Sequence, residues 1–166
     1  MAQLDKTKSA YLAGFLDGDG CISVKFEKRS KYSRGFVLKP VLSFTQHTRN
    51  RLVLENIKDW IDDGCLNDYS NKNVSELVVR KKETIKNVLV QVSPYVIVKK
   101  QQLKLMLEML ALPIFRGQQN DELFTKAYII AKQIRDLNLT PKKYQVVPLS
   151  DPVTTDQVFL KKELER

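Results

Sequence analysis

The stretch Tyr11–Val24, YLAGFLDGDGCISV, changes character within a few residues. It begins as an apolar run that is typical of a helix, and it ends with alternating apolar and polar residues, which predict a strand. We expect the helix to be capped by Thr7 or Ser9 and to run to about Leu16. The chemistry of this region depends on what lies between the helix and the strand.

Asp17 and Asp19 stand where the predicted helix stops, and Gly18 and Gly20 end it. A helix C-terminus offers unpaired carbonyl oxygens and the negative end of the helix dipole, so it favours cations. Carboxylates at that place give a hard, oxygen-rich site of the kind that Mg²⁺ prefers. The residues alone leave a plainer alternative open, in which the two acids only decorate a glycine-rich turn.

The composition predicts one folded, soluble domain. Of the 166 residues, 43% are hydrophobic and 28% are charged, which is enough apolar content to build a core. No apolar stretch approaches the roughly 18 residues of a membrane span, and the first ten residues resemble neither a signal nor a transit peptide. Cys21 and Cys65 lack metal-ligand spacing, so we expect two reduced, partly buried thiols in a reducing compartment.

The charge is basic and unevenly distributed. Lys and Arg number 28 against 19 Asp and Glu, giving a net charge of +9. Between Ile22 and Arg51 there are eight basic residues and one acid, Glu27. Such segregation predicts one positive face suited to a phosphate backbone. The alternative is an ordinary solvated surface with a basic surplus.

Periodicity predicts alternating hairpins and helices in the rest of the chain. We expect strands over 21–29 and 36–46, the second bulged or broken at Pro40, which cannot donate to a ladder. A helix over 50–63, capped by Asn50, leads into a second hairpin, 64–69 and 73–80. Further helices are expected over 82–92, 99–112, 121–138 and 154–164.

This order, αββαββα with extra helices, predicts an α+β fold with one four-stranded antiparallel sheet. The helices would cover one face of the sheet. The other face would be bare and basic, with Lys25, Arg29, Lys39 and Arg80 on it. We place the core domain at 1–139 and a C-terminal extension with a short helix at 140–166.

Ala10, Gly14 and Gly18 recur at every fourth position of the first helix. Small residues at this spacing let two helix backbones approach closely. The partner would be either another helix of the chain or the same helix of a second subunit about a two-fold axis. In the second case, both copies of Asp17 and Asp19 would meet at the end of the paired helices.

The nonamer LAGFLDGDG, Leu12–Gly20, resembles the signature of the LAGLIDADG homing endonucleases, with six of nine letters identical. The order of elements resembles the single-motif members over residues 8–140, so the resemblance implies the homing-endonuclease fold. With only one motif copy, it implies a homodimer in which each protomer forms half of a DNA-binding saddle. The implied dimer interface contains Ala10, Gly14, Asp17 and Gly18.

The resemblance also implies an active site. Asp19 corresponds to the catalytic, metal-binding acid, the carbonyl of Gly18 joins it as a ligand, and Asp17 corresponds to a structural acid at the helix end. Gln46 corresponds to a residue that orients water, and Lys99 to the active-site lysine. From the residues alone, Lys99 reads as an exposed lysine at a helix start, and a general-base role for the single histidine, His47, is disfavoured.

Outward positions of the strands and the first turn correspond to DNA-contacting positions in the family, and a basic residue beside the site corresponds to Arg49 or Arg51. Apolar valines among them indicate contacts with thymine methyl groups. The expected DNA-binding residues are Ser23, Lys25, Glu27, Arg29, Lys31, Tyr32, Lys39, Val41, Ser43, Arg51, Asn67, Tyr69, Glu76, Val78 and Arg80.

The implied function is site-specific, double-strand DNA cleavage that needs Mg²⁺ and leaves short 3′ overhangs. Mn²⁺ is expected to substitute, and Ca²⁺ to bind without supporting cleavage. We expect a pseudo-palindromic target of about twenty base pairs, an organelle-encoded gene (chloroplast or mitochondrion), and neither a membrane nor a small-molecule substrate. The alternatives are an RNA maturase that assists splicing of its intron and a DNA-binding regulator without catalysis; intact Asp19, Gln46 and Lys99 favour cleavage.

Overall fold

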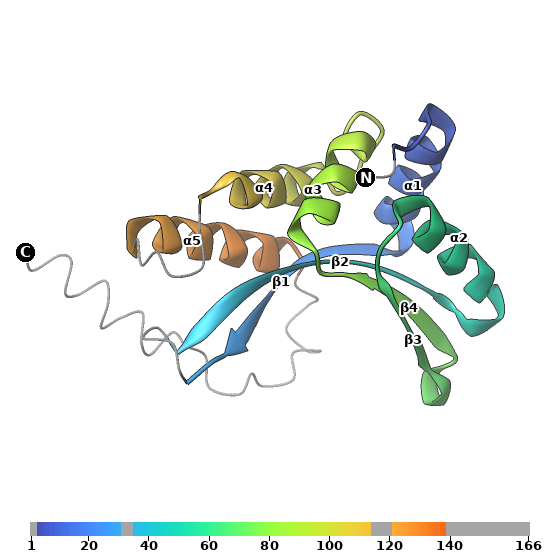
Figure 1. Cartoon of the computed structure of the whole chain (residues 1–166), viewed down its shortest axis with the longest axis horizontal. Helices are drawn as coiled ribbons and strands as arrows, with labels where there is room; N and C mark the ends of the chain where they lie inside the picture. The colour runs from blue at the N-terminus through green and yellow to red at the C-terminus, as the bar shows by residue number, and fades with distance from the viewer. Residues whose placement is uncertain (1–2, 31–34, 114–120, 139–166) are drawn as a thin grey trace, which may run out of the picture.

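The computed structural model describes residues 3–30, 35–113 and 121–138. It is an α+β fold in which helices cover one face of a curved, antiparallel four-stranded sheet and leave the other face open (Figure 1). The sheet order is β1-β2-β4-β3, and the predicted αββαββα order is confirmed. The elements are α1 (Lys6–Asp19), β1 (Gly20–Lys28), β2 (Phe36–His47), η1 (Thr48–Asn50), α2 (Arg51–Ile61), β3 (Cys65–Tyr69), η2 (Ser70–Lys72), β4 (Val74–Val79), α3 (Lys82–Val92), α4 (Lys100–Ala111) and α5 (Asp121–Leu137).

Helix α1 differs from the prediction at both ends. Its N-cap is Asp5, whose carboxylate accepts from the Lys8 N–H at 2.8 Å, so neither Thr7 nor Ser9 caps it. The helix also continues past Leu16 through Gly18 to Asp19, because a single glycine is compatible with helical dihedrals at a modest cost. Both aspartates therefore lie in the last turn of α1 and not beyond it.

Gly20 makes the direct step from α1 into β1. Its N–H bonds to the Leu16 carbonyl, and a Cβ built on it would lie 2.7 Å from the Leu16 backbone. No other residue fits this contact without moving the helix or the strand. Helix α1 and the first strand are therefore joined with no linker.

Strands β1 and β2 pair without interruption, so the predicted bulge or break at Pro40 is wrong. Pro40 stands in register with Val24 of β1. Strand β4 pairs with β2 only from Leu42 onward, so at Pro40 one side of β2 has no ladder and the missing N–H is tolerated. Ile22 and Val24 point into the core, as the alternation predicts.

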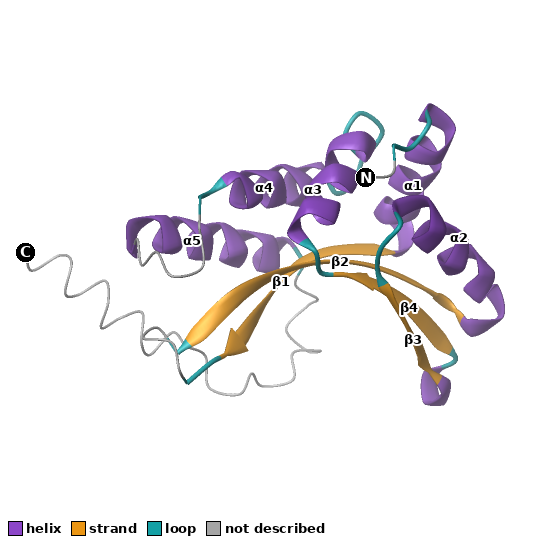
Figure 2. Cartoon of the chain, in the orientation of Figure 1, coloured by secondary structure: helices purple, strands orange, loops and turns teal. Residues whose placement is uncertain are grey.

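The second hairpin follows α2 by a tight turn, with Asp62 and Gly64 at positive φ. Asn50 occupies the N-cap position of α2 but makes no side-chain capping bond there. The buried face of α2 consists of Leu54, Ile57 and Ile61. These side chains belong to the hydrophobic core. Figure 2 shows the helices together on one side of the sheet.

The helical layer is completed by α3, α4 and α5, which pack against one another and on β1 and β2. Fully buried Phe44, Leu77, Leu89 and Met106 connect the sheet to this layer. In the described ranges, no helix has both the length and the apolar character that crossing a membrane would take. The predicted tail helix over 154–164 lies outside the described residues, and the domain boundary at 139/140 stays a prediction.

Candidate functional site

The last turn of α1 is tied to the segment before α4 by Asp17. Its carboxylate accepts three backbone N–H groups, from Ile97 at 2.7 Å, Val98 at 3.1 Å and Lys99 at 3.0 Å. The Lys99 ammonium donates in return to the Asp17 carbonyl oxygen at 2.6 Å. The motif and the predicted active-site lysine, 82 residues apart in the chain, are thus held together.

These bonds also change the acidity of Asp17. Partial burial acts to raise the pKa of its carboxyl group, but the three backbone donors and the nearby Lys99 charge outweigh it, so that the pKa lies below its usual value. Asp17 is therefore fixed as a carboxylate that bonds within its own chain. This arrangement agrees with the structural role expected for it.

Asp19, by contrast, is exposed and has one hydrogen bond from a side chain. Gln46, on β2, donates from Nε2 to Asp19 Oδ2 at 2.9 Å. The Gln46 carbonyl oxygen Oε1 accepts from the His47 N–H at 3.0 Å and from Asn50 Nδ2 at 3.3 Å. The structure thus joins two predicted site residues directly, Asp19 and Gln46. The third, Lys99, is bonded to Asp17 in the same last turn of α1.

The oxygen atoms at this helix end are of the kind that a hard divalent cation prefers as ligands. The Leu16 carbonyl already accepts from Gly20, and that of Asp17 accepts from Lys99. The Gly18 carbonyl and the exposed Asp19 carboxylate are the oxygen atoms that the sequence predicted as metal ligands. No group of three or more His, Cys, Asp or Glu that could hold a metal exists within the described part of this single chain.

The small-residue stripe of α1 faces outward. Ala10, Gly14 and Gly18 are exposed, and a Cβ added at either glycine would meet nothing within 4 Å. Of the two partners left open by the sequence, another helix of this chain is therefore excluded for the described residues. Ile97 and Val98, 77% and 71% exposed, lie beside the same helix end because their N–H groups bond to Asp17.

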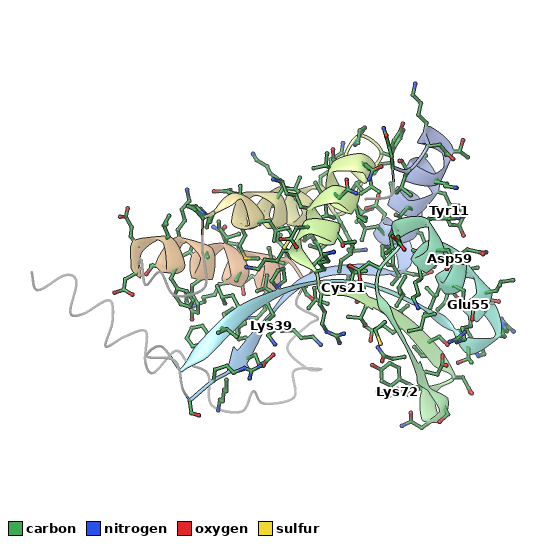
Figure 3. The ribbon with its side chains drawn as sticks, viewed as in Figure 1. Tyr11, Cys21, Lys39, Glu55, Asp59 and Lys72 are labelled. Carbon is green, nitrogen blue, oxygen red and sulfur yellow. The ribbon has the colours of Figure 1, made fainter. Side chains whose placement is uncertain are left out.

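The open face of the sheet is ordered by the strand register into rows across the strands. In the register, Lys25 lies opposite Lys39 and Ser23 lies opposite Val41. Glu76 lies between Thr45 on one side and Asn67 on the other. A central row crosses all four strands through Cys21, Ser43, Val78 and Cys65. Figure 3 shows Lys39 on the side of the sheet away from the helices.

At the β1–β2 hairpin the polar residues pair with one another. Glu27 forms ion pairs with Lys39 and with Arg29, the latter at 2.5 Å. The hydrogen bond from Lys39, aided by Arg29, holds the pKa of Glu27 below its usual value. Lys25 and Arg29 remain exposed, so this end of the face is cationic with one carboxylate between the cations.

At the β3–β4 hairpin the outward side chains are neutral or acidic. The Tyr69 hydroxyl donates to Glu76 at 3.1 Å, and this bond raises the pKa of Tyr69. Asn67 lies opposite Glu76 in the register. Cys65 is exposed, contrary to the expectation of a partly buried thiol, whereas Cys21 is half-buried; both are free.

The predicted DNA contacts differ in their exposure. Val41, Ser43 and Val78 lie on the outward side of the strands as expected but are buried in the single chain, and their contact with DNA stays a prediction. Lys31 and Tyr32 lie outside the described residues. Ser23, Lys25, Glu27, Arg29, Lys39, Asn67, Tyr69, Glu76 and Arg80 remain at least partly accessible.

Arg51 is paired within its own chain. Its Nε donates to both oxygens of Asp68, at 3.1 and 3.2 Å, and its guanidinium also pairs with Glu55. Asp68 lies on the helix side of β3 and also accepts from the buried Ser75 at 2.6 Å. With two carboxylates around it, Arg51 joins α2 to the second hairpin, and its contact with DNA stays a prediction.

His47 has a local structural role. Its Nδ1 accepts from the Arg49 N–H at 3.2 Å and so caps the short helix η1. The lone pair of Nδ1 is thus engaged by the backbone. The disfavoured role of His47 in catalysis thus receives no support from its hydrogen bonding.

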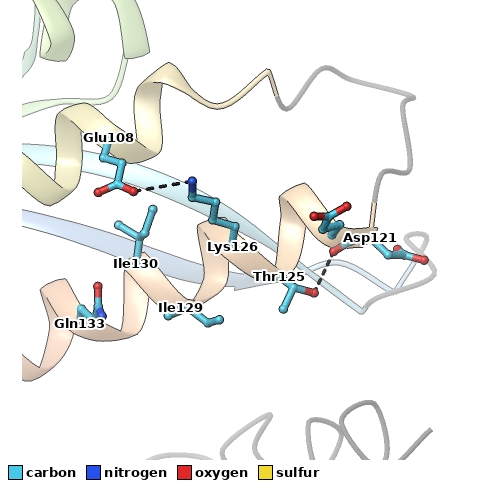
Figure 4. A pocket seen from close by; sticks show the side chains of 8 residues that line it. Glu108, Asp121, Thr125, Lys126, Ile129, Ile130 and Gln133 are labelled. Atoms are coloured by element: carbon cyan, nitrogen blue, oxygen red, sulfur yellow. Dashed lines mark hydrogen bonds and ion pairs between the residues drawn. The ribbon is translucent and has the colours of Figure 1, made fainter. Parts of the chain in front are cut away.

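A hollow of about 430 Å³ lies between α4 and α5, far from the end of α1 (Figure 4). An ion pair of 3.9 Å between Lys126 and Glu108 crosses it. Its lining residues are Glu108, Asp121, Glu122, Thr125, Lys126, Ile129, Ile130 and Gln133. The hollow contains none of the predicted site residues and belongs to the packing of the helical layer.

Sequence reasoning missed Asn50 as a partner of Gln46, and it missed the backbone of Ile97 and Val98 as partners of Asp17. Asn50 was expected only as a helix cap, and its position four residues after Gln46 was the available signal. The bonds at Ile97 and Val98 span about half of the chain and use main-chain atoms, so no side-chain pattern could reveal them.

The comparisons with known proteins agree with this geometry. The family model described as LAGLIDADG endonuclease matches residues 12–110, and the chain belongs to this family. It is similar to DNA endonuclease I-CreI of Chlamydomonas reinhardtii, 30% identical over 129 residues and covering 77% of each chain. It is also similar to DNA endonuclease I-CvuI of Chlorella vulgaris, 30% identical over 106 residues, 64% of this chain and 65% of that protein.

Solved structures show the same fold. A crystal structure of I-CvuI with the I-CreI target and 2 mM Mg, in which the DNA is not cleaved, superposes with a TM-score of 0.74 at 25% identity, covering 85% of this chain and 87% of that one. The archaeal intron-encoded homing endonuclease I-Vdi141I, in complex with DNA, gives a TM-score of 0.74 at 24% identity, with 95% and 98% covered. The fold prediction is confirmed.

Proposed function

We propose that this chain is a homing endonuclease that acts as a homodimer on a long, pseudo-palindromic DNA target. Family membership gives the class of activity, DNA endonuclease. The observation that supports a catalytic member is the exposed Asp19 carboxylate at the end of α1, held by Gln46 and placed directly before a basic strand face. The proposed catalytic carboxylate and the proposed DNA-binding face are therefore adjacent in the chain.

Double-stranded DNA as the substrate is supported by the shape and charge of the open face. Strand β2 contains 12 residues, which at about 3.3 Å each reach some 40 Å, or roughly ten to twelve base pairs. Lys25, Arg29 and Lys39 supply cations for the phosphates. Two protomers would read about twenty base pairs, and I-CvuI and I-Vdi141I are both known in complex with DNA.

A divalent cation as cofactor is supported by the incomplete oxygen site at Gly18 and Asp19. Such an ion, when bound, would neutralise charge on the phosphate that is cleaved. Crystal structures of I-CvuI with DNA were obtained in the presence of 2 mM Mg in one case and 2 mM Ca in another. We propose Mg²⁺ as the cofactor, with Mn²⁺ as a substitute and Ca²⁺ as an ion that binds without supporting cleavage.

The homodimer is supported by the exposed stripe on α1 and the apolar side chains beside it. Pairing α1 helices about a two-fold axis would cover Ala10, Gly14, Ile97 and Val98 and would bring two Asp19 carboxylates together. Gly14→Leu should therefore convert the dimer to a monomer, because a large side chain would separate the helices. Sedimentation velocity measures this, with Lys104→Leu on the exposed face of α4 as the control; a dimer that survives Gly14→Leu would place the interface elsewhere.

The direct test is cleavage of a random-sequence DNA library. Incubation with Mg²⁺, followed by sequencing of the cut ends, should return a pseudo-palindromic consensus with short 3′ overhangs. A parallel incubation with the Asp19→Asn variant controls for contaminating nucleases. A wild-type protein that binds DNA or RNA but makes no cut would favour the regulator or the maturase instead.

The genetic origin is also part of the proposal. An organelle genome, chloroplast or mitochondrial, is compatible with relatives from Chlamydomonas reinhardtii and Chlorella vulgaris. Locating the coding sequence within an intron of such a genome would test this, and a nuclear gene without a surrounding intron would contradict it.

A further inference from the structure

The amide group of Gln46 can take only one orientation in this structure. A backbone N–H can only donate, so the atom that meets the His47 N–H at 3.0 Å is the carbonyl oxygen of Gln46. The amide nitrogen then faces Asp19, at 2.9 Å from Oδ2. Gln46 thus acts on Asp19 as a donor.

Asn50 completes this arrangement. Its Nδ2 donates to the same Gln46 oxygen at 3.3 Å, so that both lone pairs of that oxygen are in use. Asn50 lies in the short helix η1, one residue before α2, and its side chain makes no capping bond for α2. The described structure therefore gives the Asn50 side chain one recorded partner, Gln46.

An oxygen with both lone pairs in use is a poor acceptor for water. Gln46 therefore has no free acceptor with which to orient an attacking water, which is the role expected from the family resemblance. Its remaining N–H is a donor, suited to a phosphate oxygen. The effect of Gln46 on the reaction would come through Asp19, whose Oδ2 it occupies while Oδ1 stays available.

We propose that Asn50 is a positioning residue for the catalytic carboxylate: it orients Gln46, and Gln46 bonds one oxygen of Asp19 so that the other would be available to a metal ion. This proposal rests on the proposed function for its kinetic consequences, but its geometry stands on the three hydrogen bonds alone. Residues that orient a metal ligand through hydrogen bonds typically contribute about 10–100-fold to metal affinity or activity.

The structural arm of the test uses the DNA-free protein. The side-chain amide resonances of Gln46, identified by their loss in Gln46→Glu, should shift in Asn50→Ala and in Asn50→Asp, which replaces the donor by a carboxylate that repels the Gln46 oxygen. Asn56→Ala, an exposed position on α2, is the matched control and should leave these resonances unchanged. Unchanged Gln46 resonances in both Asn50 variants would overturn the proposal, whether or not the protein cuts DNA.

The kinetic arm uses the target recovered from the library. Asn50→Asp should slow cleavage about tenfold or more and raise the Mg²⁺ concentration needed for half-maximal rate, with DNA affinity in Ca²⁺ within about twofold of wild type. If Asn50→Asp lowers both the DNA affinity and the thermal stability but leaves the Mg²⁺ dependence of the rate unchanged, Asn50 acts in folding and the proposal is overturned. A wild type that cuts no DNA would contradict the proposed function, and the amide resonances would still decide the positioning role.

Discussion

The end of α1 and the open face of the sheet hold their polar side chains in different ways. At the helix end, backbone N–H groups from the segment before α4 hold the Asp17 carboxylate. Gln46 of β2 holds Asp19, and Asn50 of η1 donates in turn to Gln46. On the sheet face, Glu27 and Glu76 pair with neighbours on the same surface and remain open to solvent. Chemistry needs fixed distances, whereas recognition needs side chains that can exchange one partner for another.

This difference predicts that helix-end variants lose rate at constant sequence preference, and that sheet-face variants change preference at nearly constant rate. The largest effect is expected for Asp19→Asn. Loss of the carboxylate should slow cleavage by about three powers of ten or more, because the charge stabilisation of a bound metal is worth several kcal/mol. Binding of the recovered target in Ca²⁺, measured by fluorescence anisotropy, should change little. Cleavage near the wild-type rate would remove Asp19 from the active site.

Lys99→Met should have the next largest effect. The substitution keeps the length of the side chain but removes the ammonium beside the Asp17 carbonyl. We expect cleavage to slow by about 10²-fold with little change in DNA affinity. Lys100→Met, at the exposed neighbour that starts α4, is the control. It should at most weaken DNA binding and reduce the slope of log K against log salt concentration by about one. If the two variants behave alike, Lys99 is an ordinary phosphate contact.

Asp17→Asn should mainly lower stability. An amide cannot accept all three backbone N–H groups, so the free energy of unfolding should fall by about 1–3 kcal/mol. Because the pKa of Asp17 is lowered in the folded state, its contribution is present above the usual pKa and is lost as the pH falls through the lowered one. Denaturant titrations from pH 6 to pH 3 should show a smaller acid-induced loss in Asp17→Asn than in wild type. Asp59→Asn, exposed on α2, is the control; parallel curves for all three proteins would contradict the bonding of Asp17.

The smallest effects are expected on the sheet face. Glu27→Ala would free Lys39 and Arg29, and Glu76→Ala would free Tyr69, so each should change preference at one symmetric pair of target positions by about fivefold or more. Their register partners on β2, Val37 and Thr45, are eight residues apart, so the two affected positions should lie no more than about eight base pairs from each other. Cleavage of all single-base variants of the target measures this. If both variants keep the wild-type preference at every target position, the sheet face binds DNA without reading its sequence.

The sequence predicted the elements better than the contacts between them. Alternation identified β1, and the acids of the motif located the site, because both signals are local. Pro40 misled the prediction, since its effect depends on where the neighbouring strand begins. The pairing of Arg51 with Asp68 and the burial of Val78 were not predicted, because a charge pattern reveals neither a partner nor the exposure of a side chain. The structural role of Asp17 was expected only through the family resemblance, because its partners are distant main-chain atoms.

The close contact of Gly20 with Leu16 limits how this protein can diversify. Asp19 and the first outward side chain of β1, Cys21, are two residues apart with no slack between them. Under the proposed function, the offset between the bond that is cut and the bases that β1 contacts would be set by the covalent chain itself. Point substitutions along β1 and β2 would then alter which bases are preferred and leave the position of the cut unchanged. A protein with a different cutting offset would need a new junction between its first helix and its first strand.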